Sequence, residues 1–356
     1  MKRLLLVLLL PLCATPVRAQ RNMSEEDSQP RKPSSALNLF IWREYIDPQI
    51  IQSFEQEYGC KVTVNVYEDN ETLLARLEDG GTSVYDVVVP SDYIVHSMTS
   101  RKLLAPLRHA NIPNIENLDP RFAGLDFDPR NQYTVPYQWG TVGLYVRKKP
   151  GETIDESWGL IFDAKKQIGP FLMINDARSA IGIALKYKGC SFNSTDKKQL
   201  LNARDLLIVA RKRSLGFDGA VGAKNRVLAK TCRVGMVYNG DAVRGMRLDP
   251  DTFYFVPREG SEIWLDNLAV PVHAPHRDMA ETFINYILDP RIGAQVSNFN
   301  QYATPNRAAL EFIKPEDRSN PVIYPPSDVM NKLEFVRDLG PRNAWYDELW
   351  TSINSP

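Results

Sequence analysis

The stretch FIWREY, residues 40–45, ends a predicted strand and enters a turn, and it places a tryptophan, a carboxylate and a tyrosine within four residues. Two similar clusters, SDY at 91–93 and WLD at 264–266, lie at the ends of other predicted strands. A carboxylate pairs with an ammonium group, and the face of an aromatic ring attracts a cation or packs against methylene groups. The three clusters therefore favour a binding site for an organic cation.

The chain around the first cluster predicts a parallel βαβ unit. A strand over 37–42 leads to a helix that Asp47 caps, that Pro48 begins and that Gly59 ends. The same alternation continues with a strand over 61–67, a helix capped by Asn70 and ending near Gly80, and a strand over 86–89. Because these strands are apolar, we expect helices to cover both faces of the sheet, with ligands bound at the carboxyl ends of the strands.

The later part of the chain predicts a second lobe. A β-prone run over 133–146 is expected to cross to it, and residues 266–272 are expected to return. Between the crossings lie a strand over 171–174, a helix over 196–212 and a strand over 233–238, and after them comes a helix over 277–288. The predicted fold class is α/β with two lobes, each a central sheet flanked by helices: lobe 1 over 37–140 and 265–311, lobe 2 over 141–264 and 312–356. Paired crossing strands form a hinge that limits the lobes to opening and closing.

The first 19 residues have the pattern of a secretion signal. A basic start precedes the apolar run Leu4–Leu12, which is too short to span a bilayer, and a small-residue cleavage pattern ends at Ala19. Cys13 follows the run directly, so a lipoprotein signal ending before Cys13 remains a second interpretation, although Leu12 fits it poorly. Residues 20–36, rich in Ser, Glu, Gln and Pro, predict a disordered tether. We expect a soluble periplasmic protein, held at the membrane only if Cys13 carries a lipid.

Composition and motifs exclude other classes of function. Basic and acidic residues number 43 each, with no basic run typical of nucleic-acid binding. Cys60, Cys190 and Cys232 remain after the signal; buried free thiols are expected, and a disulfide between the last two stays open. The four histidines form no HExxH motif, and neither a GxSxG elbow nor a phosphate loop occurs. We therefore expect no enzyme activity, cofactor or metal, and keep a secreted enzyme as a remote alternative.

Several stretches in order resemble the PotD/PotF family, the polyamine (spermidine/putrescine)-binding proteins of ABC transporters. They are FIWREY, YDVVVPSDY, NLDPRF through FDPRNQYTVPYQWGT, NDAR, GMVYNGDA, IWLDNLAVP and YATPN. The resemblance implies a type II periplasmic-binding-protein fold. It also implies a monomer that captures putrescine or spermidine between its lobes and delivers it to a permease and ATPase complex.

The resemblance also implies which residues bind the ligand. Aromatic cleft residues of the family match Trp42, Tyr45, Tyr93, Trp264 and Tyr302, and its acids match Glu44, Asp176 and Asp266. Ser91 matches a polar cleft residue, Tyr238 stands where the family has tryptophan, and Asp241 resembles the putrescine-binding branch. Trp139 is expected to pack in the hinge instead.

Three positions depart from the family pattern. Ser179 replaces an acid, Val336 replaces a glutamine, and Arg43 replaces a small hydroxyl residue of the first motif. A cation at Arg43 would repel a cationic ligand unless it points outward or pairs with an acid such as Glu44 or Asp241. The alternative is that the same fold binds a zwitterionic or anionic solute through Arg43.

Overall fold

The computed structural model describes residues 36–355. The predicted signal peptide, the lipidation site Cys13 and residues 20–35 of the predicted tether lie outside the described residues. Ala36, assigned to the tether, is instead the first residue of a strand, so that part of the prediction was wrong by one residue. No helix within 36–355 is long and apolar enough to cross a membrane.

The βαβ unit predicted around the first motif is confirmed. It consists of β1 (Ala36–Trp42), α1 (Pro48–Tyr58), β2 (Lys61–Tyr67), α2 (Asn70–Glu78) and β3 (Val87–Val88), and β1 pairs in parallel with both other strands. Asp47 caps α1 by accepting a hydrogen bond from the Gln49 amide, and Gly59 ends the helix at φ 62°. Turn and cap chemistry thus set the first helix as predicted.

Two details of this unit differ from the prediction. Asp69, not Asn70, caps α2, because its carboxylate accepts a hydrogen bond from the Thr72 amide. Strand β2 lies at the edge of the sheet and is not covered on both faces: Val64 and Val66 are more than 40% exposed. Apolar composition alone did not distinguish an edge strand from a buried one.

The remaining elements follow the predicted alternation. The strands are β4 (Thr134–Arg147), β5 (Phe171–Ile174), β6 (Phe217–Asp218), β7 (Val234–Tyr238), β8 (Thr252–Phe255), β9 (Ser261–Ala269) and β10 (Leu333–Phe335). The helices are α3 (Asp92–Ser100), α4 (Gly159–Phe162), α5 (Ala177–Tyr187), α6 (Lys197–Arg211), α7 (Ala220–Leu228), α8 (Asn239–Leu248), α9 (Arg277–Ile287), α10 (Pro290–Asn300), α11 (Pro315–Arg318), α12 (Ser327–Met330) and α13 (Asn343–Asn354). Short 3₁₀ turns cover Gly81–Ser83, His109–Asn111, Pro113–Asn117, Arg307–Glu311 and Gly340–Arg342.

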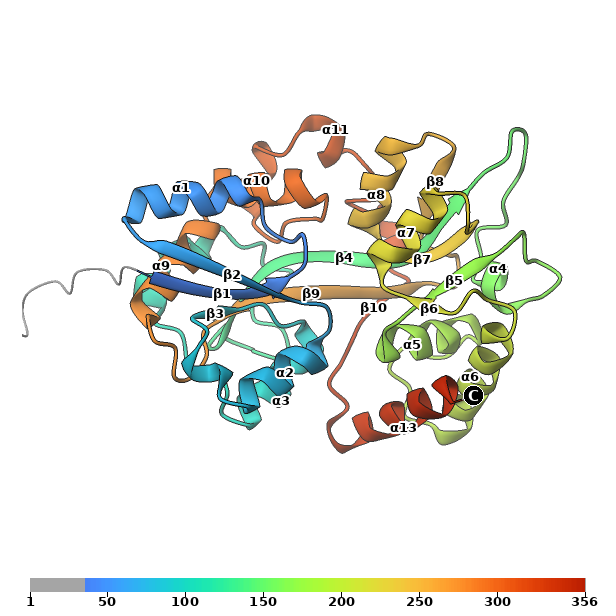
Figure 1. Ribbon diagram of the computed structural model, residues 1–356, viewed down its shortest axis with the longest axis horizontal. Coiled ribbons are helices and arrows are strands. Elements are labelled where there is room, and N and C mark those ends of the chain that lie inside the picture. The colour runs from blue at the N-terminus through green and yellow to red at the C-terminus, as the bar shows by residue number, and fades with distance from the viewer. Residues whose placement is uncertain (1–35, 356) are drawn as a thin grey trace, which may run out of the picture. The chain divides into compact units, whose positions relative to one another are not determined.

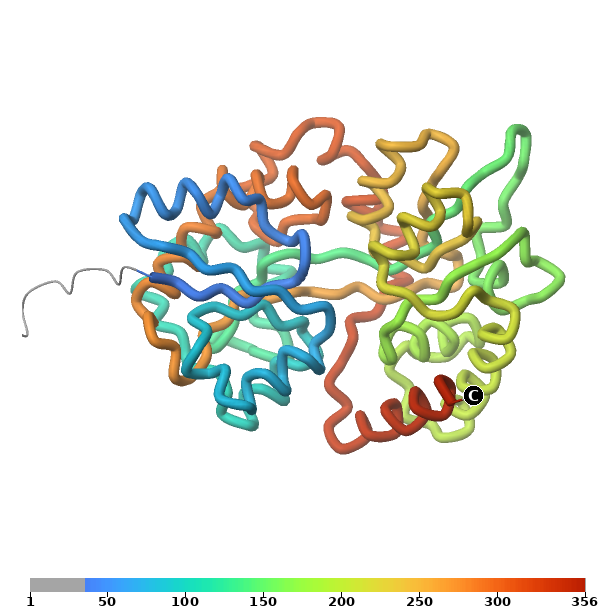
Figure 2. The backbone as a smooth tube through the Cα atoms, in the orientation of Figure 1, coloured from blue at the N-terminus to red at the C-terminus, as the bar shows by residue number. Residues whose placement is uncertain are grey.

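Two long strands connect the two lobes (Figure 1). β4 and β9 pair in antiparallel fashion from Thr134–Ala269 to Thr141–Ile263, and they lie at the centre of the strand order β2-β1-β3-β9-β4-β7-β5-β6. The tube in Figure 2 shows the chain passing between the halves along both strands. The second crossing begins at Ser261 and not at residue 266 as predicted. The prediction placed the start too late because the first residues of the strand, Ser261 and Glu262, are polar.

Each lobe has its own apolar core. One core packs β1 and β3 against α1 and α9, with Phe54 and Phe283 buried in contact, and the other packs β5 and β7 against α5 and α6. Trp139 on β4 is 4% exposed and stacks on Phe122, in agreement with its predicted packing role in the hinge.

The cysteines of the described chain are free thiols. Cys232 is buried, whereas Cys60 and Cys190 are half-buried, so the prediction of buried thiols holds for one of the three. The disulfide between Cys190 and Cys232, left open by the sequence, is not formed.

Candidate ligand-binding cleft

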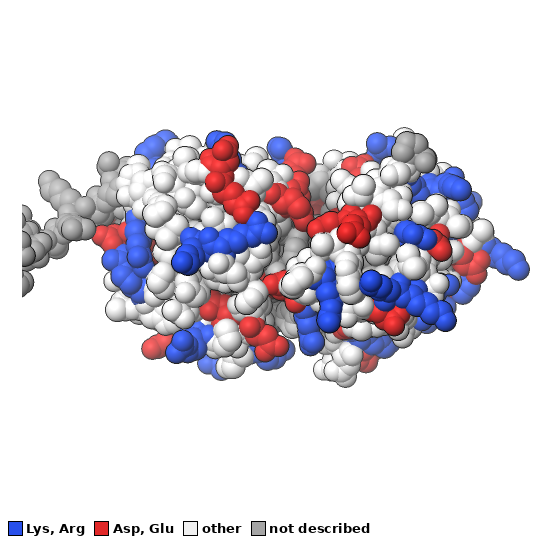
Figure 3. Space-filling view, turned by 90° about the horizontal axis from the view of Figure 1, so that it is seen from below, with Lys and Arg blue, Asp and Glu red and all other residues white. Residues whose placement is uncertain are grey.

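A cleft of about 390 Å³ is lined by residues from both lobes and from the crossing strand β9. In the space-filling view, acidic side chains gather along the hollow between the two halves (Figure 3). All the residues predicted to bind a ligand line this one cleft: Trp42, Arg43, Glu44, Tyr45, Ser91, Tyr93, Asp176, Tyr238, Asp241, Trp264, Asp266 and Tyr302. Ser179 and Val336, the two other departures from the family pattern, line it as well.

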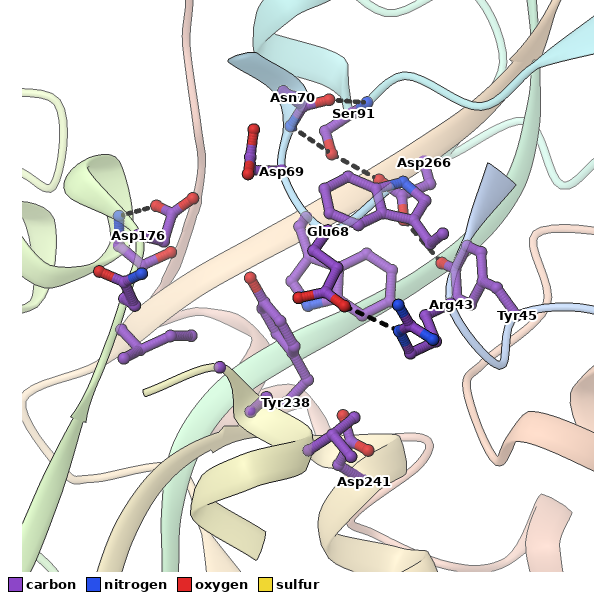
Figure 4. A pocket seen from close by; sticks show the side chains of 18 of the residues that line it. Arg43, Tyr45, Glu68, Asp69, Asn70, Ser91, Asp176, Tyr238, Asp241 and Asp266 are labelled. Carbon is purple, nitrogen blue, oxygen red and sulfur yellow. Dashed lines mark hydrogen bonds and ion pairs between the residues drawn. The ribbon is translucent and has the colours of Figure 1, made fainter. Parts of the chain in front are cut away.

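Asp266 lies on β9 and is held by two hydroxyl groups (Figure 4). Its carboxylate accepts hydrogen bonds from the Ser91 hydroxyl at 2.6 Å and from the Tyr45 hydroxyl at 2.7 Å. Burial raises the pKa of Asp266 to about 6, and the two hydrogen bonds oppose that rise. The result is a buried carboxylate that is oriented before a ligand arrives.

Asn70 fixes the position of two of these neighbours. Its side-chain amide donates to the Ser91 hydroxyl at 3.1 Å and to the Tyr93 hydroxyl at 3.0 Å, and its carbonyl oxygen accepts from the Ser91 amide. The sequence analysis treated Asn70 only as a helix cap and missed this function. Only the fold brings α2 against the SDY motif.

Aromatic rings form the floor and walls of the cleft. Trp264 contacts Tyr238 and Tyr302 edge to face, with ring centroids 5.7 and 5.0 Å apart. The indole lies directly over Gly140 of β4, where a Cβ atom would be only 2.4 Å from the ring. A glycine at this position is therefore required for the close approach of the tryptophan.

Arg43 does not pair with either of the acids suggested by the sequence. Its Nε donates to Glu68 at 2.8 Å, and both side chains are more than half exposed. Of the two possibilities left open by the sequence, the guanidinium points outward, because the turn after β1 directs it toward the loop after β2 (Figure 4). The ion pair with Glu68 and the exposure to solvent together weaken the repulsion between Arg43 and a cationic ligand.

Asp241 is already surrounded by cations of its own chain. It accepts a hydrogen bond from Arg244 at 2.5 Å and from the Tyr302 hydroxyl at 2.9 Å, and Lys224 Nζ lies 3.8 Å away. Arg244 also lies 3.8 Å from Glu44. The sequence analysis missed Arg244, although its spacing of three residues from Asp241 on one helix is typical of such a pair.

The far end of the cleft holds further acids. Asp176 caps α5 by accepting from the Ser179 amide at 2.7 Å, and it lines the cleft at the same time. Burial, and then Asp176, raise the pKa of nearby Glu71 to about 7. Asp92 and Glu262, which the sequence analysis did not select, are 1% and 2% exposed and also line the cleft.

The chain resembles known proteins over nearly all of its length. A family model described as bacterial extracellular solute-binding protein matches residues 49–321. The spermidine/putrescine-binding periplasmic protein of Escherichia coli K12 is 30% identical over 326 residues, covering 90% of this chain and 92% of that protein. The putrescine/cadaverine-binding protein of Pseudomonas aeruginosa is 30% identical over 334 residues, covering 89% and 93%. A solved structure from Listeria monocytogenes, described as a candidate spermidine/putrescine ABC transporter, is 35% identical with a TM-score of 0.84, covering 90% of this chain and 99% of that one.

Proposed function

Because the chain belongs to the bacterial extracellular solute-binding proteins, we propose that its cleft captures a polyamine, spermidine or putrescine, and delivers it to an ABC importer. Proteins of this family bind solutes outside the cytoplasm and are not enzymes, which agrees with the predicted export and absence of catalysis. The single observation that carries the polyamine is Asp266, a buried carboxylate surrounded by aromatic rings.

The residues of the cleft suit an alkyl polyamine. An ammonium donates to Asp266, and methylene groups pack on the rings of Trp264, Trp42 and Tyr238. One charge-assisted hydrogen bond contributes about 1.5–3 kcal/mol and a desolvated cation–ring contact about 2 kcal/mol. Two anchored amines then give micromolar or tighter binding after the costs of association, about −8 kcal/mol.

The remaining contacts are part of the same proposal. The walls of the cleft are completed by Glu44, Tyr45, Ser91, Tyr93, Asp176 and Tyr302. Asp241 contributes by holding Arg244 in an ion pair. We assign lobe 1 to 37–140 and 265–311 and lobe 2 to 141–264 and 312–356, with closure about β4 and β9. The partners would be a permease and an ATPase that receive the ligand from a monomer, and a lipid at Cys13 would be the only anchor to the membrane.

The experiment is a binding screen on the mature protein. Putrescine, spermidine and spermine are compared with amino acids and buffer sulfonates by thermal shift, since a ligand that binds only the native state raises the melting temperature. Polyamines are expected to stabilise wild type, and Asp266→Asn is expected to abolish most of the shift. Selective stabilisation by an acidic or zwitterionic solute, with polyamines inert, would refute the proposal in favour of binding through Arg43.

A further inference from the structure

Strand β9 presents an acid, a ring and an acid on one face. Side chains alternate across a strand, so Glu262, Trp264 and Asp266 point to the same side, and all three line the cleft. Trp264 and Asp266 are already assigned to the ligand, whereas Glu262 has no role among the contacts described above.

Glu262 is a buried carboxylate without a matching cation. It is 2% exposed, and its Oε2 has no hydrogen-bond partner within residues 36–355. None of the ion pairs of the described chain includes it. Burial and then Asp176 raise its pKa to about 8, and the Ser179 hydroxyl and Arg178 oppose that rise. An unpaired buried carboxylate is costly, and a cation entering the cleft would remove the cost.

Asp241, another buried acid of the cleft, already has cationic partners within the chain. Asp241 is bound by Arg244 and lies close to Lys224, so an incoming ammonium would have to displace a guanidinium of the chain itself. Asp266 and Glu262 accept hydrogen bonds from hydroxyl groups only. They are the two acids on β9 at which an amine adds a new ion pair without breaking one.

The spacing of these two acids indicates the length of the ligand. Four residues of extended strand separate their Cα atoms by about 13 Å. An extended alkyl chain advances about 1.2 Å per bond, so the nine bonds of a triamine such as spermidine span about 11 Å and the five of putrescine about 6 Å. Because each ammonium lies about 2.8 Å inside its carboxylate, the two nitrogens at these acids are about 7 Å apart, which is close to the span of about 6 Å of a butane diamine unit, and putrescine and spermidine both contain that unit.

We propose that Glu262 is a second amine-binding acid and that Glu262, Trp264 and Asp266 together bind the two amines of a butane diamine unit. The inference rests on the proposed function and names the ligand within it. The ligand lies along β9, with the four-carbon chain of this unit over Trp264 and one amine at each acid.

The test is calorimetric titration of wild type and Glu262→Gln with spermidine and putrescine. The substitution keeps the shape of the side chain and removes its charge, and spermidine affinity is expected to fall about tenfold to a hundredfold. Putrescine affinity is expected to fall by a similar factor, because its two amines contact the same two acids. Glu116→Gln, an equal change at an exposed position away from the cleft, is expected to match wild type for both ligands.

Each outcome decides a separate claim. Wild type that binds neither amine refutes the proposed function itself. Wild type that binds both, with Glu262→Gln binding spermidine equally well, refutes the role of Glu262 alone. A loss for spermidine with no loss for putrescine refutes the span along β9. The ligand-free melting temperature of Glu262→Gln is measured in parallel and is expected not to fall, so that a loss of binding cannot be a loss of fold.

Discussion

Substituting Asp266 by asparagine is expected to weaken binding and to stabilise the empty protein. The pKa of Asp266 rises from 3.8 to about 6 through burial, so the carboxylate form is disfavoured in the ligand-free fold. Two units correspond to about 3 kcal/mol, which is an upper limit for the stability lost as the pH rises from below 4 to above 6. Asparagine cannot ionise and still accepts one hydroxyl bond, so Asp266→Asn is expected to gain part of that amount at pH 7.5.

The sign of the pH dependence separates this account from a simple packing role. A carboxyl group whose folded pKa is raised contributes stability below its unfolded pKa and loses that contribution as the pH rises through its folded pKa. Urea unfolding at pH 4.5 and pH 7.5 therefore should give wild type and Asp266→Asn similar stabilities at the lower pH, with the variant ahead at the higher pH. Spermidine affinity at pH 7.5 should fall about tenfold or more, from one lost charge-assisted hydrogen bond.

Two results would refute the reasoning. A variant that is less stable than wild type at pH 7.5 would mean that the hydrogen bonds from Ser91 and Tyr45 outweigh the cost of burying the charge. A variant that binds spermidine as tightly as wild type would mean that the ligand does not contact Asp266. Asp278→Asn, on an exposed part of α9, is a control for the change in net charge, although its ion pair with Arg108 is lost.

Three further predictions concern neighbouring groups. Spermidine binding at pH 7 should release protons, because an ammonium lowers the raised pKa of Glu262, which Asp176, Ser179 and Arg178 face. Calorimetry in buffers of different ionisation enthalpy measures the number of protons released, and an unchanged number in Glu262→Gln would contradict the prediction. Gly140→Ala should cost about 1–3 kcal/mol in urea unfolding and also weaken ligand binding, because its Cβ would overlap Trp264; Gly219→Ala, with open space around it, is the control for stability only, because Gly219 also lines the cleft. Arg43→Ala should change stability by less than about 1 kcal/mol, since its pair with Glu68 is exposed, and should leave polyamine affinity equal or slightly higher; a large loss of polyamine affinity would contradict this expectation.

The sequence predicted the elements of the fold wherever local chemistry decides them. Asp47, Pro48 and Gly59 act on the backbone within their own helix, and the structure has that helix within a residue of the predicted bounds. The start of β9 was missed because its first two residues are polar: Glu262 lines the cleft, and Ser261 is buried and donates to the Val142 carbonyl. A polar strand start of this kind has the composition of a loop, and only the pairing with β4 identifies it as strand.

The site was predicted as a set of residue types but not as a set of ion pairs. Trp42, Asp176 and Trp264 are far apart in the sequence and line one cleft, which the motifs anticipated through the family resemblance. The partners of Arg43 and Asp241 could not be read from the sequence, because each pairing depends on how a side chain leaves its turn or helix. Long cationic side chains reach several acids from one position, and the structure alone decides which of them is used.

The placement of the proposed acids on β9 has a consequence for closure. β9 belongs to both lobes as a crossing strand, so a ligand held by Glu262 and Asp266 would rest on the hinge while Trp42 and Tyr238 approach it from opposite sides. Movement of the lobes then changes the wall contacts and the access of water more than it changes the distance between the two acids. Excluding water strengthens each ion pair, since the effective dielectric constant falls. We therefore expect the spacing of two amines to be selected on the strand itself, and the affinity to be completed by closure of the two lobes over it.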